Sequence, residues 1–531
     1  MKIVIPTSVD VKAMVAGLNV SPTKAKGYEM RIHYFLSQVM TTNENWKLNK
    51  DNNFYRNICS EVMKQIIGDD YYEIVGLLTS KINPIVECDE SYSNLPDKEP
   101  KCKGYRLTSR YNTGEYVYRQ LPAKFASKVL KYLPDDAESK RMTKQYSFLI
   151  EQYHKHQMGI NPSVYDYLSN FGKELLQCVD DDNYYQKHLI YNLIGRWLFD
   201  VQKLEDGDLN PKVAGSNHRL NSVFTNLPKR LRGFVECNGT PLYSIDLSAS
   251  QPYILSKVMD TSFIEGVGYG FNVCTIYRDV YNKLTHKGLI KSNFFKSNSG
   301  RYPFMWGEFF FPNEVQSIME FQQIPFNNDF YKYVISKGFS NPSQDDEFPK
   351  LRKEFKDKMM YILFSDKNGF RQHDDQIKMF TKVFSGVNKW LELSHQIIGK
   401  REFALIMQRC ESWLLLHNVC RVFLDKHPDI PLFTIHDGLF TYEEYTQDLA
   451  NLIVATCREF IGVEPGLKIE PPRVEIYPRR QDVDNEWIEI KPIYSEERFE
   501  KVKGGVFKSN IERGLDFINN YSKATNYRNA A

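Results

Sequence analysis

The sequence has few features that would tie it to a disulfide framework, a structural zinc site or a membrane. Its nine cysteines are scattered, and no two of them form a C-x-x-C pair. Such a distribution is typical of a protein that stays reduced in the cytosol. No apolar run approaches the roughly 18 residues of a transmembrane helix, and the N-terminus lacks the apolar core of a signal peptide. We therefore expect a soluble cytoplasmic protein that has no membrane partner.

The sequence also lacks a marked excess of either charge. Its 69 Lys and Arg residues against 66 Asp and Glu residues leave a formal net charge of +3. This charge is too small to indicate a nucleic-acid partner by itself, so any basic surface must come from local segregation of charge. The length of 531 residues predicts several domains or one multi-lobed enzyme, because a single core rarely serves a chain this long.

Two stretches are locally basic. Residues 105–153 interleave Lys and Arg with Tyr, a pattern that can follow a phosphate backbone and stack on bases but is equally typical of solvated helix faces. His218–Phe234 carries four cations and several short polar side chains, which either contact phosphates and sugars or form an ordinary basic loop. The residues concerned are Arg219, Asn221, Ser222, Thr225, Asn226, Lys229, Arg230 and Arg232.

Pro241–Leu255, with the sequence PLYSIDLSASQPYIL, joins an apolar run to a cluster of small polar residues. The pattern predicts a buried strand that ends at Asp246, a break at Pro252 and a helix from Tyr253. An Asp between a strand and a helix is also a favoured N-cap. This stretch by itself therefore leaves Asp246 open between a helix cap and a functional ligand.

Pro431–Tyr442 consists of an apolar run, His436-Asp437-Gly438 and a second apolar run. Because glycine permits the positive φ of a tight turn, the stretch predicts two strands with His436 and Asp437 at the tip of a hairpin. Asp-Gly is itself a favoured turn pair, so the hairpin needs no functional explanation.

Three further segments have the apolar spacing of helices. Tyr184–Leu204 is predicted to be a core helix, and Arg401–Leu424 a buried helix in which Gln408 and Glu411 are the unusual polar members. In the third segment, Phe348–Gly369, a spacing of four places cations and bulky groups on one helical face. These residues are Arg352, Lys356, Met360 and Phe364. Such a face either holds a triphosphate and covers a base or is a solvated amphipathic surface.

Asp246, at a strand end, and Asp437, at a hairpin tip, are far apart in the chain but could meet on one sheet. Nucleotidyl transfer to a nucleic-acid 3′ hydroxyl needs two divalent cations about 3.5 to 4 Å apart. Hard cations take oxygen ligands, and two carboxylates with one backbone carbonyl suffice when substrate phosphates and water complete the coordination. If the two carboxylates meet, they would form such a site.

Five motifs, taken in order, resemble those of a known family. They are Arg219-Leu220-x-Ser222 through Asn226-Leu227-Pro228, then IDLSASQ, then R-x-x-x-K at Arg352, then IMQRCES, then TIHDGLF. Together they span roughly residues 216–445 and resemble the motifs of family A DNA polymerases and their single-subunit RNA polymerase relatives. In style they are most similar to the small polymerases of phages, plasmids, virophages and related mobile elements.

The resemblance implies a role for each matched residue. Asp246 and Asp437 would be the catalytic pair that binds two Mg²⁺ ions, with Mn²⁺ as a substitute and the carbonyl of Leu247 as a further ligand. Contacts to primer or template would come from Arg219, Asn226, Arg232, Gln408 and His436. The incoming nucleotide would be bound by Gln251, Arg352, Lys356 and Phe364. Lys358 would take the role of Lys356 if the family motif is aligned two residues further along.

Gln251 departs from the family pattern. The DNA polymerases of the family have a Glu five residues after the first Asp, where it excludes the ribose 2′ hydroxyl. The D-x-S-x-S order of Asp246, Ser248 and Ser250 is also similar to the RNA polymerase branch. The choice of sugar therefore stays open at this point.

The resemblance predicts an α+β fold of the right-hand polymerase type, with an antiparallel-sheet palm, helical fingers and a helical thumb. The predicted ranges are 1–104 for an N-terminal domain of unknown role, 105–215 for the thumb, 216–260 and 400–490 for the palm, 261–399 for the fingers and 491–531 for a C-terminal tail.

The predicted function is template-directed DNA synthesis, which extends a 3′ hydroxyl and releases pyrophosphate. It would occur in the cytoplasm, or inside the host cell of a phage or mobile element. Its partners would be primer-template DNA, nucleoside triphosphates and a replication protein such as a helicase. One alternative is a single-subunit RNA polymerase or a primer-synthesising polymerase. The other is a non-catalytic nucleic-acid-binding replication protein on a polymerase scaffold.

Overall fold

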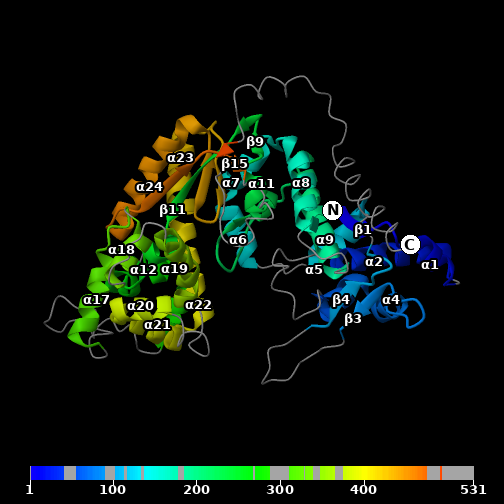
Figure 1. The fold of residues 1–531 in the computed structure, drawn as a ribbon, viewed down its shortest axis with the longest axis horizontal. Coiled ribbons are helices and arrows are strands. Elements are labelled where there is room, and N and C mark those ends of the chain that lie inside the picture. The colour runs from blue at the N-terminus through cyan, green and yellow to red at the C-terminus, as the bar shows by residue number, and fades with distance from the viewer. Residues whose placement is uncertain are drawn as a thin grey trace.

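The structure is a computed structural model that describes residues 2–18, 20–40, 55–89, 102–112, 116–132, 137–177, 184–266, 270–286, 310–327, 329–338, 347–364, 375–474 and 491–492. This part of the chain is rich in helices, and its small sheets are antiparallel (Figure 1). The predicted α+β class is therefore confirmed. Of the predicted tail, 491–531, all but residues 491–492 lies outside the described residues.

The N-terminal part of the chain has a hydrophobic core of its own, which extends from Ile3 to Val129. Its first strand, β1 (Lys2–Pro6), pairs with β5 (Tyr116–Gln120). The predicted boundary after residue 104 therefore falls inside this unit, because a pairing between such distant segments has no local signal in the sequence. The other elements of the unit are α1 (Val11–Ala16), α2 (Pro22–Val39), β2 (Arg56–Asn57), α3 (Ser60–Ile67), α4 (Tyr71–Leu78), β3 (Val86–Cys88), β4 (Gly104–Leu107) and α5 (Ala123–Tyr132).

A second, larger core begins at Met142 and ends at Ile461. Its first helices lie between the N-terminal unit and the rest of the molecule in Figure 1. Among them, α9 (Tyr184–Glu205) confirms the core helix predicted for this segment. The other elements before the central sheet are α6 (Ala137–Gln145), α7 (Ser147–Lys155), β6 (Met158–Ile160), α8 (Ser163–Gln177), β7 (Lys212–Val213), β8 (Leu220–Asn221), α10 (Val223–Asn226), α11 (Lys229–Arg232), β9 (Val235–Cys237) and β10 (Thr240–Pro241).

The central sheet has four antiparallel strands in the order β12-β13-β11-β14. They are β11 (Tyr243–Ser248), β12 (Phe433–Ile435), β13 (Gly438–Thr441) and β14 (Gly466–Glu470). β12 and β13 are the two strands of the predicted hairpin. Along β11, buried Ile245 and Leu247 alternate with half-buried polar residues. One face of the strand therefore lies on the core, and the other carries polar side chains.

The helix after β11 begins earlier than predicted. α12 (Ser250–Val258) starts two residues after the strand, and the linking Ala249 has a left-handed φ of 51°. Pro252, which was expected to break the chain before a helix from Tyr253, lies within the first turn of α12. The prediction is wrong because the first N–H groups of a helix have no intrahelical partner, so a proline is tolerated there.

Every element that the structure describes between α12 and residue 400 is a helix. Several of its helices lie at the lower left of Figure 1, beneath the sheet. They are α13 (Thr261–Glu265), α14 (Val273–Ile276), α15 (Arg278–His286), α17 (Pro312–Gln322), α18 (Phe330–Gly338), α19 (Glu347–Phe364), α20 (Asp375–Val383) and α21 (Ser385–Ile398).

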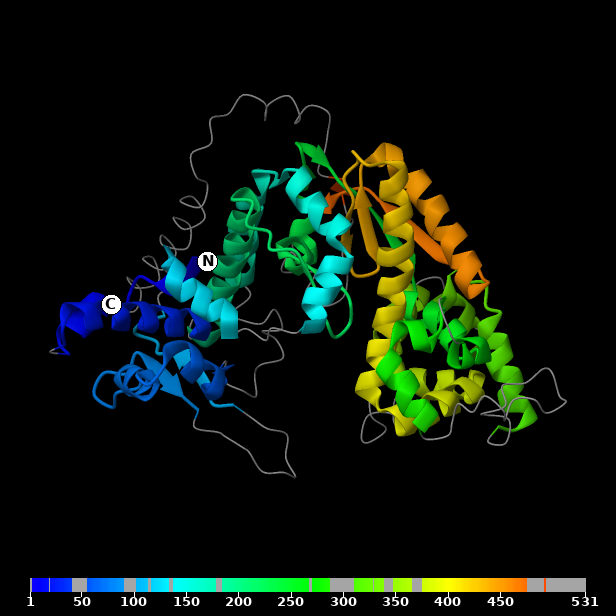
Figure 2. The same ribbon diagram turned by 180° about the vertical axis from the view of Figure 1, so that it is seen from behind.

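The buried helix predicted for Arg401–Leu424 is present as a continuous run. It consists of α22 (Lys400–Ser412), a π-helical segment (Trp413–Val419) and α23 (Cys420–Lys426). Figure 2 shows this run rising from the helical region to the sheet. α24 (Thr446–Ile461) packs on the π-helical segment and on β11. The run from α22 to α23 therefore extends from the helical region to the sheet (Figure 2), and it carries Gln408 and Glu411.

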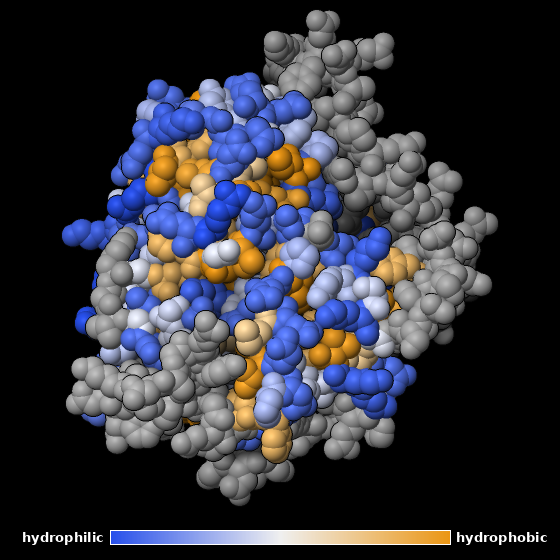
Figure 3. Space-filling model, turned by 90° about the vertical axis from the view of Figure 1, so that its left-hand side faces the viewer, coloured by the Kyte–Doolittle hydropathy of each residue, from blue (hydrophilic) through white to orange (hydrophobic). Residues whose placement is uncertain are grey.

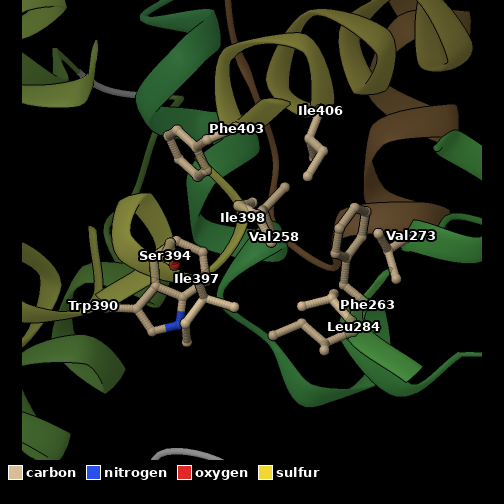
Figure 4. A pocket seen from close by; sticks show the side chains of 11 residues that line it. Val258, Phe263, Val273, Leu284, Trp390, Ser394, Ile397, Ile398, Phe403 and Ile406 are labelled. Carbon is tan, nitrogen blue, oxygen red and sulfur yellow. The ribbon is translucent and has the colours of Figure 1, made fainter. Parts of the chain in front are cut away.

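We assign no function to the surface patches and the cavity of the described residues. Figure 3 shows that hydrophilic residues cover most of one side, with separate hydrophobic patches between them. None of the described helices is long and apolar enough to cross a membrane. A cavity of about 40 Å³ lies among α12, α21 and α22, with Val258, Trp390, Phe403 and Ile406 in its walls (Figure 4).

Candidate active site

Asp246 lies on the polar face of β11. It is the fourth residue of the strand rather than its end, so the predicted strand is present but longer. It stands opposite Gly438 of β13 on one side and Lys468 of β14 on the other. Ser244 Oγ donates a hydrogen bond to Asp246 Oδ2 over 3.4 Å. Because paired residues of neighbouring strands share a face, the Asp246 side chain lies beside the start of β13.

Asp437 lies in the turn between β12 and β13, directly before Gly438. The turn consists of His436 and Asp437, as predicted. Its positive φ belongs to His436, at 55°, whereas the sequence pattern attributed it to Gly438. The amide of Leu247 donates to the carbonyl of Asp437 over 3.4 Å, which ties the turn to β11. The two candidate carboxylates are therefore carried by backbone segments that contact each other.

Gly438 is required for space rather than for its φ. A Cβ at this position would lie 2.3 Å from Asp246 Oδ1 and 3.3 Å from the carbonyl oxygen of Ile435. Any larger residue must therefore displace the Asp246 carboxylate. Glycine at position 438 leaves beside Asp246 a space that a side chain would fill.

The Asp246 carboxylate has an unfavourable electrostatic environment. Burial, followed by the charges of Asp437 and Glu470, raises the pKa of Asp246 from its ordinary value of 3.8 to about 6. The hydrogen bond from Ser244 and the charge of Lys229 act in the opposite direction without compensating. Carboxylates that repel each other in a partly buried site form an arrangement that a bound cation relieves.

Glu411 is a third carboxylate of this region, and it is only 1% exposed. Arg219 Nη2 donates to Glu411 Oε1 over 2.5 Å, and Gln251 Nε2 donates to Glu411 Oε2 over 2.7 Å. Burial raises the pKa of Glu411 to about 7; the charge of Asp437 acts in the same direction, and Arg219 opposes both. Glu411 therefore links α22 to α12 and to the loop before β8, beside the carboxylate pair.

α22 also fixes the loop that carries Arg219. Arg409 donates to the carbonyls of Ser216 and Gly215 over 2.7 and 3.1 Å, and its guanidinium stacks over Tyr277. The Ser412 hydroxyl donates to the carbonyl of Asn217 over 3.3 Å. These bonds hold the loop backbone against the helix.

The predicted site residue Gln408 lies on the same helix. It is half-buried and precedes Glu411 by three residues. Side chains at this spacing share a helical face. Gln408 therefore lies on the face of α22 that carries Glu411.

The cations predicted around the site are present near the turn. His436 is exposed, and partial removal from water, followed by the charges of Arg219 and Arg232, lowers its pKa. Lys229 is exposed on α11, and its charge reaches Asp246. Arg232 Nε also donates to the carbonyl of Leu227 over 2.9 Å.

Three polar residues of the stretch before β9 have different surroundings. Ser222 and Thr225 are buried and form a capping box at the start of α10, with bonds of 3.2 and 2.7 Å between their side chains and amides. Their expected role in phosphate contacts is therefore replaced by helix capping, which short hydroxyl side chains favour equally. Asn226, the last residue of α10, is exposed.

The nucleotide-binding residues predicted on α19 contact other side chains or lie exposed. Arg352 pairs with Asp329, with its Nε 2.5 Å from Asp329 Oδ2. Lys356 is exposed, Lys358 lies over the ring of Tyr361, and the Phe364 ring packs against Phe403.

The oxygen ligands at this place fit magnesium. No group of three or more His, Cys, Asp or Glu side chains that could hold a metal occurs in the described ranges. The candidate set is smaller and consists of the Asp246 and Asp437 carboxylates with the Leu247 carbonyl. Mg²⁺ is usually held by one or two carboxylates together with waters and substrate phosphates. The space beside Asp246 Oδ1 and the repulsion between the carboxylates agree with a cation here.

Comparisons with known proteins assign no family to this chain. No family model matches it, and no curated protein matches it. Among solved structures, it is similar to the POL domain of Pol1 from M. smegmatis, solved in complex with DNA primer-template and dNTP. The TM-score is 0.38 at 13% sequence identity, over 65% of this chain and 72% of that chain. A likeness this remote does not by itself assign a fold or an activity.

Sequence reasoning assigned no role at the site to two carboxylates of this region, Glu411 and Glu470. Glu411 did carry a signal, because it is an ionisable residue inside an otherwise apolar helical stretch, and such a residue needs a partner. Glu470 had no comparable signal, since exposed carboxylates on strands are common.

Proposed function

We propose that this chain is a template-directed polymerase that extends a nucleic-acid 3′ hydroxyl with nucleoside triphosphates and releases pyrophosphate, with DNA as the favoured product. The observation that carries the proposal is the placement of Asp246 on β11 beside the Asp437 turn, where burial and the charge of Asp437 both disfavour ionisation of the Asp246 carboxyl. Structural carboxylates are normally paired with a cation of the protein, whereas catalytic carboxylates are often held unpaired for a metal.

The carboxylate pair and the Leu247 carbonyl would hold Mg²⁺. When bound, the ions would acidify the attacking hydroxyl and neutralise charge on the triphosphate. The chain contributes the rigid placement of the ligands. The bond from the Leu247 amide to the Asp437 carbonyl fixes the turn on the strand, and Gly438 keeps the space beside Asp246 free of side-chain atoms.

Nucleic acid would approach the site through the cations near the turn. Exposed Lys229 and the neighbouring Arg232 can contact phosphates, and His436 at the turn can contact the primer end. The lowered pKa of His436 favours the neutral ring, which would act by hydrogen bonding. Arg219, Asn226 and Gln408 would complete this surface.

The triphosphate would be bound by the α19 residues Arg352 and Lys356, with Lys358 as the alternative to Lys356. Arg352 would exchange its ion pair with Asp329 for the phosphate. The Arg352 side chain is 40% exposed, and exposed ion pairs contribute only about 0 to 1 kcal/mol, so the exchange costs little. Phe364 and Gln251 would contact the base and the sugar.

In this proposal the central sheet and α22 belong to the palm, within 216–260 and 400–490, and the helical region within 261–399 forms the fingers. The helices α6 to α9 would form the thumb. The unit around the N-terminal core, which extends to Val129, would be an additional domain.

The decisive experiment is primer extension by the purified full chain with Mg²⁺. Asp246→Ala and Asp437→Ala should each abolish extension, because either change removes a ligand from the pair. Binding to the same primer-template, measured by fluorescence anisotropy, should stay near the wild-type value in both. Asp425→Ala, on the exposed side of α23, is the matched control and should leave both quantities unchanged.

The same assay separates the alternatives. A non-catalytic binding protein would bind DNA without extension and would be indifferent to both substitutions at the pair. Efficient extension with ribonucleotides in place of deoxynucleotides would make the chain an RNA or primer polymerase. Wild-type synthesis by Asp437→Ala would refute the assigned site.

A further inference from the structure

We propose that Glu411 is a positioning residue of the polymerase site, whose carboxylate holds Arg219 away from the carboxylate pair and forms a matched pair with the amide of Gln251. The activity that this inference predicts rests on the proposed function. The contact between Gln251 and Glu411 does not, and it can be measured without activity.

Both oxygens of Glu411 are used. Arg219 donates to one and Gln251 to the other, and the carboxylate and Gln251 are 1% and 8% exposed. Hydrogen bonds to a buried carboxylate are of the stronger, charge-assisted kind. The two donors come from different segments, the loop before β8 and the first turn of α12. Glu411 therefore fixes both side chains from a third element, α22.

The charge of Glu411 determines where the Arg219 guanidinium rests. The charge of Asp437 also acts on Glu411, and the charge of Arg219 acts on His436, next to Asp437. If Glu411 loses its charge, Asp437 becomes the neighbouring anion for Arg219. An arginine on Asp437 would compete with a cation for that ligand. Glu411 thus keeps Asp437 available to magnesium.

The pairing also restricts position 251. A Glu there would face Glu411 with two acceptors and two negative charges in a buried place, which is unfavourable. Exchanging the two residues keeps the pattern intact. In Gln251→Glu/Glu411→Gln, the amide at position 411 can accept from Arg219 and donate to the carboxylate at position 251. One carboxylate still faces one amide.

The test uses Glu411→Gln, Gln251→Glu, the double exchange and the wild type as purified full chains. Glu402→Gln makes the same chemical change nine residues earlier on α22 and is the control. Glu411→Ala is not used, since it would leave the half-buried Arg219 without this ion-pair partner. Each protein is measured for melting temperature, primer-template affinity, kcat, KM for deoxynucleotide and the Mg²⁺ concentration at half-maximal rate.

We expect Glu411→Gln to raise the half-maximal Mg²⁺ concentration by about tenfold, a larger change than in DNA affinity or in KM for nucleotide, as expected for coupled neighbouring groups. Gln251→Glu should lower both melting temperature and kcat. The double exchange should recover at least about tenfold of the kcat lost in Gln251→Glu, together with most of the melting temperature. Glu402→Gln should leave kcat and the Mg²⁺ requirement unchanged and lower the melting temperature only slightly, through the lost charge at the start of α22.

Two results would overturn the inference. One is a double exchange that melts no higher than Gln251→Glu, because then the two positions are not a matched pair. The other is a Glu411→Gln protein with the wild-type Mg²⁺ requirement, because then Glu411 does not control Arg219. A wild-type chain without any extension would refute the proposed function instead, and the melting temperatures would still test the pair.

Discussion

Replacing Asp246 by Asn should make the protein inactive and, without metal, more stable. The rise of the Asp246 pKa from 3.8 to about 6 measures how much the folded protein disfavours the ionised form. At about 1.4 kcal/mol for each tenfold change in proton affinity, this rise corresponds to about 3 kcal/mol. Asn has the same shape and no charge, so Asp246→Asn should recover a large part of that free energy of unfolding near pH 8.

The pH dependence has a definite sign. Because the folded-state pKa lies above the unfolded one, the folded protein holds this proton more tightly between about pH 4 and pH 6. The contribution of Asp246 to stability therefore falls as the pH rises through this window and stays low above it. The Asn variant lacks this dependence. Its stability advantage should be close to zero at about pH 4 and largest above about pH 7.

Magnesium should reverse the order of stability. A cation that binds only the folded protein stabilises it in proportion to the logarithm of its concentration. The melting temperature of the wild type in EDTA should therefore rise when Mg²⁺ replaces the chelator, whereas that of Asp246→Asn should barely change. Asp425→Asn, on the exposed surface of α23, is the control and should behave as the wild type in both buffers.

One result would refute this reasoning about the site. If Asp246→Asn melts below the wild type in EDTA at pH 8, the Asp246 carboxylate has a stabilising partner in the folded protein. Its burial and the neighbouring carboxylates then do not destabilise the ionised form. Thermal melts over the pH range, with and without Mg²⁺, decide the question without any measurement of activity.

Three further outcomes follow from single contacts. Gly438→Ala should fold normally, because the backbone φ at position 438 suits alanine, and circular dichroism checks this. Its kcat in primer extension should fall at least about tenfold, because the new Cβ displaces the Asp246 carboxylate. A wild-type kcat would contradict this expectation. Arg352→Ala should raise the KM for deoxynucleotide several-fold without changing DNA affinity, and an unchanged KM in steady-state kinetics would remove Arg352 from the nucleotide site. Ser222→Ala should cost about 1 kcal/mol of stability through the lost helix cap while DNA binding stays constant. Weaker DNA binding at unchanged melting temperature would instead restore the phosphate-contact role of Ser222.

Local patterns were sufficient to predict the elements around the site. The apolar spacing of residues 184–204 and 401–424 identified α9 and the run from α22 to α23. The two apolar runs around His436-Asp437 identified the hairpin. These predictions hold because helical and strand periodicities arise from contacts between residues that are neighbours in the chain.

The same local reasoning failed where a residue has two equivalent local uses. Ser222 suits a phosphate or a helix cap, and Pro252 suits a break or the first turn of a helix. The structure resolves both in favour of the helix. The positive φ of the hairpin belongs to His436 rather than to Gly438. Gly438 is needed instead for its small size, because the Asp246 carboxylate lies close to its Cα.

Long-range packing decided the rest. β1 pairs with β5, which lies near the end of the N-terminal unit in the sequence. Glu411 accepts hydrogen bonds from Gln251 and Arg219, which are 160 and 192 residues away in the sequence. The sequence showed that Asp246, Gln251, Glu411 and Asp437 were unusual where they stood. Only the tertiary structure decided which of them face each other, because the free energy of a buried charge depends on neighbours that the chain brings from far away.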